Sequence, residues 1–250
     1  MHPPRFYGPK LTVGTVALDE EQSRHALRSL RLRSGDALEL FDGAGRVAVG
    51  PLMPNSDLGS AVEGGRLARG PRTATITVDR IRETPPQARR LTLLIAGCKG
   101  PRLTWMIEKC TELGVTRICL CDFARSVVKV GESHVSKLRR TAIEACKQCG
   151  RNWLPAIEAN HKLASFLGDR PAETLLVASP AEETLSLGGW LAGSGGRLAT
   201  LTVVIGPEGG LRDDELQALA DDGAQSVHLA EHTLRVETAA VAMVAAWAAL

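Results

Sequence analysis

The 250-residue sequence contains no uninterrupted run of 18 or more apolar residues. A helix that crosses a bilayer needs about 20 such residues, so we expect no membrane span. The first ten residues, MHPPRFYGPK, lack the apolar stretch of a secretory leader, which argues against export. The six cysteines lie inside apolar patterns and not at disulfide-framework spacings, as is usual in a reducing compartment. Together these absences predict a cytoplasmic protein.

Several signatures of nucleotide binding and catalysis are also missing. No G-x-G-x-x-G follows the first strand expected in the larger part, because the glycines of Gly97-Cys98-Lys99-Gly100 are wrongly spaced. The turn GPEGG at residues 206–210 lacks the Lys-Ser/Thr pair of a P-loop, and no G-x-S-x-G nucleophile elbow occurs. These absences argue against dinucleotide and nucleoside triphosphate ligands.

A four-thiolate zinc site would have to use the pairs Cys119-x-Cys121 and Cys146-x-x-Cys149. We expect the first pair to point to opposite faces of a strand and the second pair to lie inside a helix, whereas zinc knuckles place such pairs on turns. No histidine neighbours a cysteine in the sequence, so a catalytic thiol is not expected either. We therefore expect no metal.

The apolar pattern changes along the chain and predicts two domains. Residues 1–80 contain short alternating runs at 37–41, 47–49 and 73–78 and one short helix at about 19–28 with Asp19 as its N-cap. This part is predicted to be a small β-rich module. Residues 54–72 are rich in Gly, Pro and Ser and predict a loop, and residues 83–87 predict the linker.

Strands and helices alternate in the larger domain, residues 81–250. The strands are expected at 91–96, 115–121, 175–178, 201–205 and 226–229. The helices are expected at 99–114, at 134–150, weakly within 185–196, after 212 and from 237 onward. Such alternation predicts the α/β class, with a parallel sheet that is covered on both faces.

Two strand–loop–helix units follow each other in residues 200–250. The turn GPEGG follows the first strand, and residues 230–234 follow the second. Loops that follow parallel strands meet at one edge of the sheet, where open α/β sheets bind ligands. Glycine allows a positive φ and a close approach to a ligand, and Pro207 stiffens the turn. We therefore expect a ligand site at this edge.

The formal net charge of +2 hides an uneven distribution. Residues 99–151 contain 11 Lys and Arg against 5 Asp and Glu, whereas residues 200–250 contain 2 against 8. A basic region of this kind can follow a phosphate backbone, although charge alone leaves open a merely solvated helix face. A second basic cluster, four arginines and His25 within residues 24–33, predicts an RNA contact on the small module.

Five segments carry a resemblance to a known family. They are HALRSLRLRSGDALELFDGAG (25–45), IEKCTELGV (107–115), IEACKQCGR (143–151), IGPEGG (205–210) and LRVETAA (234–240). In this order they resemble the RsmE family of bacterial 16S rRNA uridine-N3 methyltransferases, members of the SPOUT superfamily. IGPEGG followed about 25 residues later by LR-x-ETA is specific to that family. The chain departs from the family pattern at Ala230, where a glycine is usual.

The resemblance implies a fold and an activity. It implies an N-terminal PUA-like β-barrel that binds RNA and a C-terminal SPOUT domain with a mostly parallel sheet and a deep trefoil knot within about residues 175–250. It also implies a homodimer that binds S-adenosylmethionine in the knot loops and methylates uridine N3 at position 1498 of 16S rRNA in the small ribosomal subunit. An RNA ribose 2′-O-methyltransferase of the same superfamily and a non-catalytic RNA-binding homologue are the alternatives.

Site residues follow from the loops and from the resemblance. The expected cofactor-binding residues are Ser179, Pro180, Ile205, Gly206, Pro207, Glu208, Gly209, Gly210, Leu229, Ala230, Thr233 and Leu234. The expected RNA-binding residues are Arg24, Arg28, Arg31, Arg33, Lys109, Arg125, Lys129, Gln148 and Arg151.

Arg235 and Glu237 are the catalytic candidates. A fixed cation lowers the barrier when negative charge spreads over the uracil carbonyl oxygens, and we assign this role to Arg235. A salt bridge to Glu208 or Glu237 is its alternative role. Glu237 is either a proton acceptor or a residue that stabilises a helix start. The apolar helix at 238–250 is predicted to lie either in the core or in a dimer interface.

Overall fold

The computed structural model describes residues 3–54, 73–170, 173–179, 184–193 and 198–250. It divides into two compact units. The small unit comprises Met1–Pro86 and Gly150–Trp153, and the large unit comprises Gln87–Cys149 and Leu154–Leu250. The boundary therefore falls inside the segment 83–87, and nearly all of the Gly/Pro/Ser-rich stretch lies outside the described residues.

The small unit contains a six-stranded sheet in the order β1-β3-β4-β5-β2, with β6 paired to β4. Its strands are β1 (Arg5–Tyr7), β2 (Gly14–Ala17), β3 (Ala37–Phe41), β4 (Arg46–Pro54), β5 (Ala74–Val78) and β6 (Arg82–Glu83). Alternate residues of β3 and β5 are buried, among them Leu38, Leu40 and Ile76, because successive side chains point to opposite faces of a strand. The three strands predicted at 37–41, 47–49 and 73–78 are confirmed, while β1, β2 and β6 were not predicted.

The predicted helix at 19–28 is present, but its second half is π-helical and not α-helical. The α-helix α1 (Glu20–Arg24) continues as one π-helical turn, His25–Ser29, which Leu30 closes by donating its N–H to the carbonyl of His25 at 3.0 Å. Asp19 is the N-cap, since its carboxylate accepts the N–H of Gln22 at 2.7 Å.

Residues Gly150–Trp153 return to the small unit after the large unit has begun. The Gly45 N–H donates to the Asn152 carbonyl at 3.1 Å, and the Trp153 indole N–H donates to the Thr84 carbonyl at 3.0 Å. Gly45 has φ +93°, and a Cβ there would lie 2.5 Å from the Trp153 ring, so the turn requires glycine. Arg151 therefore belongs to the small unit, which corrects its assignment to the larger domain.

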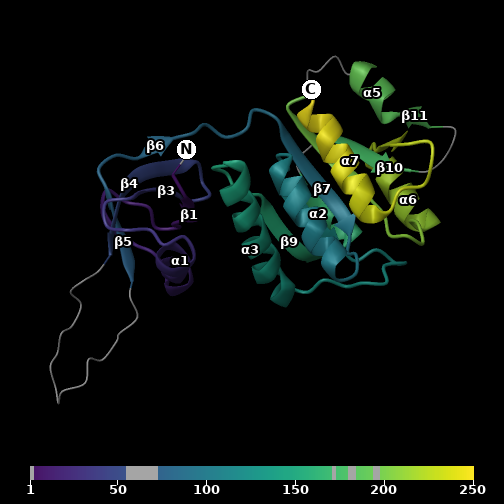
Figure 1. Cartoon of the computed structure of the whole chain (residues 1–250). Helices are drawn as coiled ribbons and strands as arrows, with labels where there is room; N and C mark the ends of the chain where they lie inside the picture. Colours follow the sequence, from purple (N-terminus) through teal and green to yellow (C-terminus); the bar gives the residue numbers. More distant parts are fainter. Residues whose placement is uncertain (1–2, 55–72, 171–172, 180–183, 194–197) are drawn as a thin grey trace. The chain divides into compact units, whose positions relative to one another are not determined.

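The large unit is built on a seven-stranded sheet in the order β11-β13-β10-β12-β7-β8-β9, of which Figure 1 labels β7, β9, β10 and β11. All its strand pairs are parallel. The strands are β7 (Arg90–Ala96), β8 (Arg117–Cys121), β9 (Ala156–His161), β10 (Thr174–Ala178), β11 (Leu185–Ser186), β12 (Thr200–Ile205) and β13 (Gln225–His228). The central strands β7 and β12 are almost continuously apolar and buried, as expected for a parallel sheet covered on both faces.

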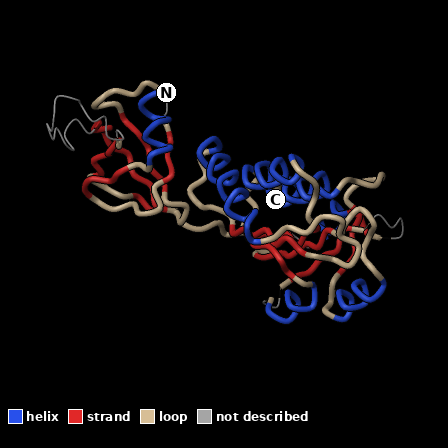
Figure 2. The backbone as a smooth tube through the Cα atoms, turned by 90° about the horizontal axis from the view of Figure 1, so that it is seen from below, coloured by secondary structure: helices blue, strands red, loops and turns tan. Residues whose placement is uncertain are grey.

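Helices cover both faces of this sheet (Figure 2). They are α2 (Pro101–Glu112), α3 (Glu132–Cys149), α4 (Leu163–Asp169), α5 (Leu187–Gly193), α6 (Asp213–Asp221) and α7 (Val236–Ala248). Buried residues of α2, α3, α5 and α7 share one core cluster with the sheet, and those of α4 and α6 share another. The predicted α/β architecture with a parallel sheet is confirmed.

Three expectations need correction. Neither β9 nor α4 was expected. Cys119 and Cys121 lie in the same core cluster, not on opposite faces, because residues two apart in a strand share a face. Cys149 is exposed at the end of α3, so the second cysteine pair is not wholly interior. Within the described residues, no helix is both long and apolar enough to span a bilayer.

Candidate active site

A cavity of about 300 Å³ lies at the carboxyl ends of three neighbouring strands. Ala178 at the end of β10 is in register with Ile205 of β12 on one side and with Val227 of β13 on the other. The three chains therefore leave the sheet side by side, and the segments that follow β12 and β13 enclose the cavity. This is the edge at which the sequence places a ligand site.

The structure brings most of the expected cofactor-binding residues together around this cavity. Those that line it are Ser179, Ile205, Gly206, Pro207, Glu208, Gly210, Leu229, Ala230, Thr233 and Leu234. Gly209 does not line the cavity, and Pro180 lies outside the described residues. The lining residues that the sequence did not indicate are Val177, Ala178, Leu211, Leu216, His232, Val236 and Ala239. Val236 and Ala239 are three apart on α7, a spacing that places them on one helix face.

The GPEGG turn is tight, and its glycines are required for different reasons. The N–H of Gly210 donates to the carbonyl of Pro207 at 2.8 Å. Only Gly210 among the three glycines has a positive φ, +73°, so the expected positive φ applies to this one position. A Cβ on Gly206 would lie 2.9 Å from Cγ of Leu211, so Gly206 permits the close packing of Leu211 against the strand end.

The loop between β8 and α3 anchors the GPEGG turn from outside. Arg125 donates from Nη1 to the carbonyls of Gly209 at 3.0 Å and Leu211 at 3.3 Å. Glu215 accepts the N–H of Ala124 at 2.8 Å and the N–H of Arg212 at 2.9 Å. The second of these bonds satisfies a free N–H at the start of α6. The turn is thus anchored by the side chain of Arg125, which is 84 residues from Gly209 in the sequence.

The segment that follows β13 is held differently. Residues 230–233 are exposed, and we find no side-chain hydrogen bond to them from the described part of the chain. Ala230 is not among the described residues with a positive φ, which are Arg31 and Asn160 apart from glycines. An alanine therefore fits this position without backbone strain, although the family usually has glycine there.

Arg235 is the N-cap residue of α7 and is exposed. It does not line the cavity, but it immediately follows Leu234, which does. It forms no ion pair with Glu208, with Glu237 or with any other described residue, so the salt-bridge alternative is wrong for this structure. Its side chain is therefore exposed and not engaged by the described residues.

Glu237 is buried in the first turn of α7, with a side chain only 8 % exposed. Its Oε1 lies 3.5 Å from Nε of Arg102, and its Oε2 is buried without a hydrogen-bond partner. A carboxylate in this position also offsets the positive end of the helix dipole. Glu237 does not line the cavity.

Cys98 lies between β7 and α2, close to these acidic groups. Burial raises the pKa of its thiol to about 11, and the negative charges of Glu237 and Glu208 add to the increase, against Arg102. The thiol is therefore protonated at neutral pH and unsuited to nucleophilic attack.

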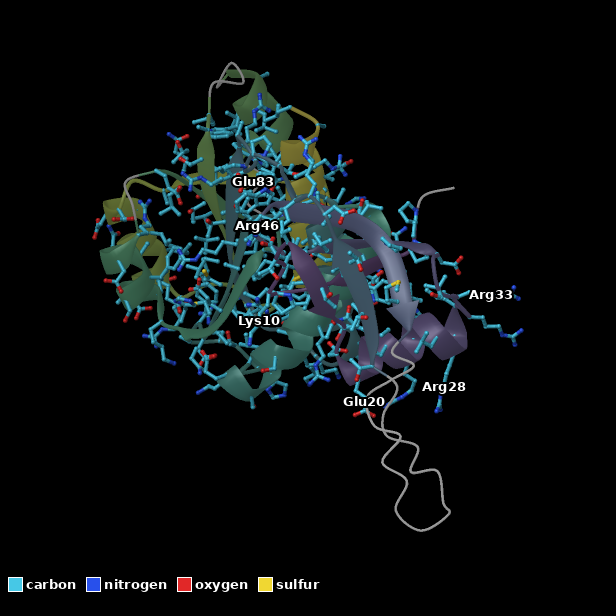
Figure 3. The ribbon with its side chains drawn as sticks, turned by 90° about the vertical axis from the view of Figure 1, so that its left-hand side faces the viewer. Lys10, Glu20, Arg28, Arg33, Arg46 and Glu83 are labelled. Carbon is cyan, nitrogen blue, oxygen red and sulfur yellow. The ribbon has the colours of Figure 1, made fainter. Side chains whose placement is uncertain are left out.

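The expected RNA-binding residues are dispersed over both units. In the small unit, Arg28 and Arg33 extend away from the strands into solvent (Figure 3), Arg31 is exposed, and Arg24 is paired with Glu20 at 2.8 Å. In the large unit, Lys129 and Gln148 are exposed.

Two other members of that set are already engaged in contacts. Lys109 is held by Glu108 at 2.8 Å and Glu112 at 2.9 Å, and these carboxylates raise its pKa. Arg125 anchors the GPEGG turn, as described above. Their cationic groups are therefore less available for phosphate than those of Arg28 and Arg33.

Cys119, Glu158 and His161 place potential metal ligands within 4.8 Å of one another near the β9 edge of the sheet. Glu158, however, accepts hydrogen bonds from Arg117 at 2.9 and 2.7 Å. Burial also raises the pKa of the Cys119 thiol to about 12. The Arg117 guanidinium already engages both Glu158 oxygens, which makes this cluster unfavourable for a cation.

Comparison with known proteins identifies the class of protein to which the chain belongs. Residues 85–248 match the model of the RNA methyltransferase domain, and residues 18–50 match that of the RNA methyltransferase PUA domain. The chain is 30% identical over 227 residues to ribosomal RNA small subunit methyltransferase E of Synechocystis sp., covering 90% of this chain and 70% of that protein. It is also 30% identical over 239 residues to the Mycobacterium bovis protein of that name, covering 91% and 84%. The chain belongs to the ribosomal RNA small subunit methyltransferase E family.

A solved structure of the same family has the same fold. The crystal structure of a ribosomal RNA small subunit methyltransferase E from Neisseria gonorrhoeae bound to S-adenosyl methionine superimposes with a TM-score of 0.78 at 28% identity. The match covers 98% of this chain and 96% of that one. Both units are therefore shared with a protein that binds this methyl donor.

Proposed function

We propose that this protein transfers a methyl group from S-adenosylmethionine to N3 of a uridine in 16S rRNA, at position 1498 of the small ribosomal subunit in the cytoplasm. The observation that carries the proposal is the cavity at the ends of β10, β12 and β13, in a chain whose relatives are named for small-subunit rRNA methylation. The position and the atom rest on the family resemblance.

The cavity suits the methyl donor chemically. S-adenosylmethionine contains adenosine and a sulfonium but no phosphate, so it requires backbone hydrogen-bonding groups and apolar walls. The described lining contains no lysine or arginine, while Leu211, Leu229 and Leu234 supply apolar surface and the GPEGG turn supplies backbone groups. The volume, about 300 Å³, lies at the lower end of the range for small-molecule sites.

The bound donor supplies an electrophilic methyl group, and the protein's own residues orient and activate the acceptor. As uridine N3 loses its proton, negative charge spreads to the flanking carbonyl oxygens. The exposed guanidinium of Arg235, which forms no ion pair with the described residues, stabilises this charge. Glu237 is buried and paired with Arg102, which favours a structural role at the start of α7. The alternative role of Glu237 is to accept the proton of uridine N3.

The substrate is bound by a second set of groups. The exposed arginines of the small unit and Lys129 and Gln148 of the large unit contact the RNA backbone, and the cavity edge selects the base. The N3 edge of a paired uridine is hidden, so the base is presented unpaired or flipped. We propose that the six strands of the small unit form the PUA-like barrel.

The proposal includes a trefoil knot within about residues 175–250. The strand order supports it. In the sequence, β10 comes before β12, yet β12 lies between β7 and β10 in the sheet. It also includes a homodimer. Trp105 of α2 is 44% exposed, and the apolar side chains of Val241, Ala242, Ala245 and Ala246 on α7 are only half-buried. We expect light scattering to report twice the chain mass, and Trp105→Glu to shift it to the monomer.

The function is tested by incubating the purified protein with unmethylated 16S rRNA or small subunits and S-adenosylmethionine carrying a labelled methyl group. Nucleoside analysis of the digested RNA should show label in N3-methyluridine. Label in a 2′-O-methylated nucleoside would identify the ribose methyltransferase alternative, and absence of both cofactor binding and label would identify the non-catalytic one.

A further inference from the structure

The described residues that line the cavity include a carboxylate but no lysine or arginine. Glu208 is the only Asp, Glu, Lys or Arg among the described residues that line it. Glu208 is exposed and forms no ion pair with any described residue. Among the described residues, no cation therefore pairs with the carboxylate at the GPEGG turn.

The carboxylate of Glu237 is also nearby, but its negative charge is partly offset. Glu237 is paired with Arg102 at 3.5 Å and sits in the first turn of α7, where the helix dipole opposes its charge. Glu208 has no such partner. Its field nevertheless reaches the protein interior, since it contributes to the raised pKa of the buried Cys98 thiol.

The reaction changes the charge of the small-molecule ligand. The sulfur–methyl bond breaks with its electron pair left on sulfur, the methyl carbon–N3 bond forms, and the proton of N3 leaves. A sulfonium with a positive charge thus becomes a neutral thioether, while the ammonium and carboxylate of the amino-acid portion are unchanged. A carboxylate near the sulfur position distinguishes donor from product by Coulomb attraction alone.

We infer that Glu208 is the residue that sets the preference for S-adenosylmethionine over S-adenosylhomocysteine, holding the sulfonium form and releasing the neutral product. This inference rests on the proposed function and assigns one residue of that site a role in product release. Such a role matters because product release limits the turnover of many enzymes.

The test is calorimetric titration of the full-length protein and of Glu208→Gln with S-adenosylmethionine, S-adenosylhomocysteine and sinefungin, an analogue with an amine-bearing carbon in place of the methylsulfonium. The amide keeps the size of the side chain and removes its charge. We expect Glu208→Gln to weaken S-adenosylmethionine and sinefungin roughly five- to tenfold and S-adenosylhomocysteine less than about twofold. Raising the salt concentration should reduce the donor-to-product affinity ratio of the unmodified protein and leave that of Glu208→Gln unchanged.

Glu231→Gln is the matched control. Glu231 is exposed in the segment after β13 and does not line the cavity, so its variant removes one negative charge from the same edge without altering the cavity. We expect it to keep the donor-to-product ratio of the unmodified protein. An equal change in the ratio for Glu231→Gln would overturn the inference by showing a general field effect.

The remaining outcomes separate the inference from the proposed function. Equal weakening of all three ligands by Glu208→Gln overturns the inference, because the carboxylate would then contact a group common to them or only order the turn. An unchanged ratio overturns it as well. If the unmodified protein binds none of the ligands, the proposed function fails, and the inference fails with it. Circular dichroism melts of each variant identify any loss of folding.

Discussion

The segments that follow β12 and β13 share one cavity but are held in place in different ways. The GPEGG turn after β12 is fixed by Arg125 and by its own internal hydrogen bond. Residues 230–233 after β13 are exposed and receive no side-chain hydrogen bond from the described residues. The first segment has the properties of a rigid support, and the second lacks such anchors among the described residues.

This difference separates the predicted effects of mutations into two kinds. Changes in the GPEGG turn should act on cofactor affinity, because they disturb a preformed surface. Changes at Arg235 should act on the rate of methyl transfer, because its guanidinium has no structural partner among the described residues.

The largest effect is expected for Arg235→Ala. Removing the cation that we propose to stabilise charge on the uracil oxygens should lower kcat by about 10²–10³, while the Kd for S-adenosylmethionine changes less than about twofold. Single-turnover methylation and calorimetry measure the two quantities. Arg212→Ala removes the other cation of residues 200–250, one that is paired with Asp214 at 3.0 Å, and should keep kcat near its original value. Full activity of Arg235→Ala would remove the distinction between the two segments.

The next largest effect is expected for Gly210→Ala. A side chain at φ +73° costs about 1–2 kcal/mol in the left-handed region, so the turn should shift or lose stability. We expect the Kd for S-adenosylmethionine to rise roughly tenfold while kcat at saturating cofactor falls much less. An unchanged Kd would show that the GPEGG turn is not the cofactor support.

A smaller effect is expected for Arg125→Ala. Two hydrogen bonds to carbonyls of the turn are lost, each of which contributes about 0.5–1.5 kcal/mol, but their loss from an exposed site is partly compensated by water. The Kd for the cofactor should rise about three- to tenfold, and Arg125→Lys should recover part of the loss.

Val127→Ala serves as its control, because Val127 is 72% exposed on the same loop. If Arg125→Ala reduces RNA affinity and leaves cofactor affinity intact, Arg125 is an RNA contact as the sequence predicted, and the anchoring role is wrong.

The smallest effect is expected for Ala230→Gly, which restores the usual family residue. Because Ala230 already has an unstrained φ, glycine gains nothing and loses up to about 1 kcal/mol through the entropy of the unfolded chain. Cofactor affinity should change less than about twofold. A large gain in affinity would show that the bound form of this segment requires a backbone conformation absent from the present structure.

The sequence predicts the central part of the fold well because the buried parallel strands β7, β10 and β12 are continuous apolar runs. It fails for β9, whose sequence AIEANH has a single fully buried residue, Ala159. A strand at the edge of the sheet contacts one neighbour only, so its apolar pattern is weak. The short helix α4 was missed along with it.

Local sequence patterns likewise predict only part of the candidate site. The turn residues were predictable from local sequence, since glycine and proline specify a turn directly. The anchoring of that turn was not, because Arg125 and Gly209 are 84 residues apart. The return of Gly150–Trp153 to the small unit depends on a glycine, Gly45, that lies more than 100 residues earlier and carries no local signal for it.

The most direct test of the central claim is mapping of 16S rRNA from a strain in which the gene is deleted and then restored. Methylation at N3 blocks the pairing edge of uracil, so reverse transcription should stop at position 1498 when the intact gene is present. The account predicts that this stop disappears on deletion, returns with the intact gene and does not return with the gene for Arg235→Ala. A stop that persists after deletion, or that Arg235→Ala restores fully, would contradict it.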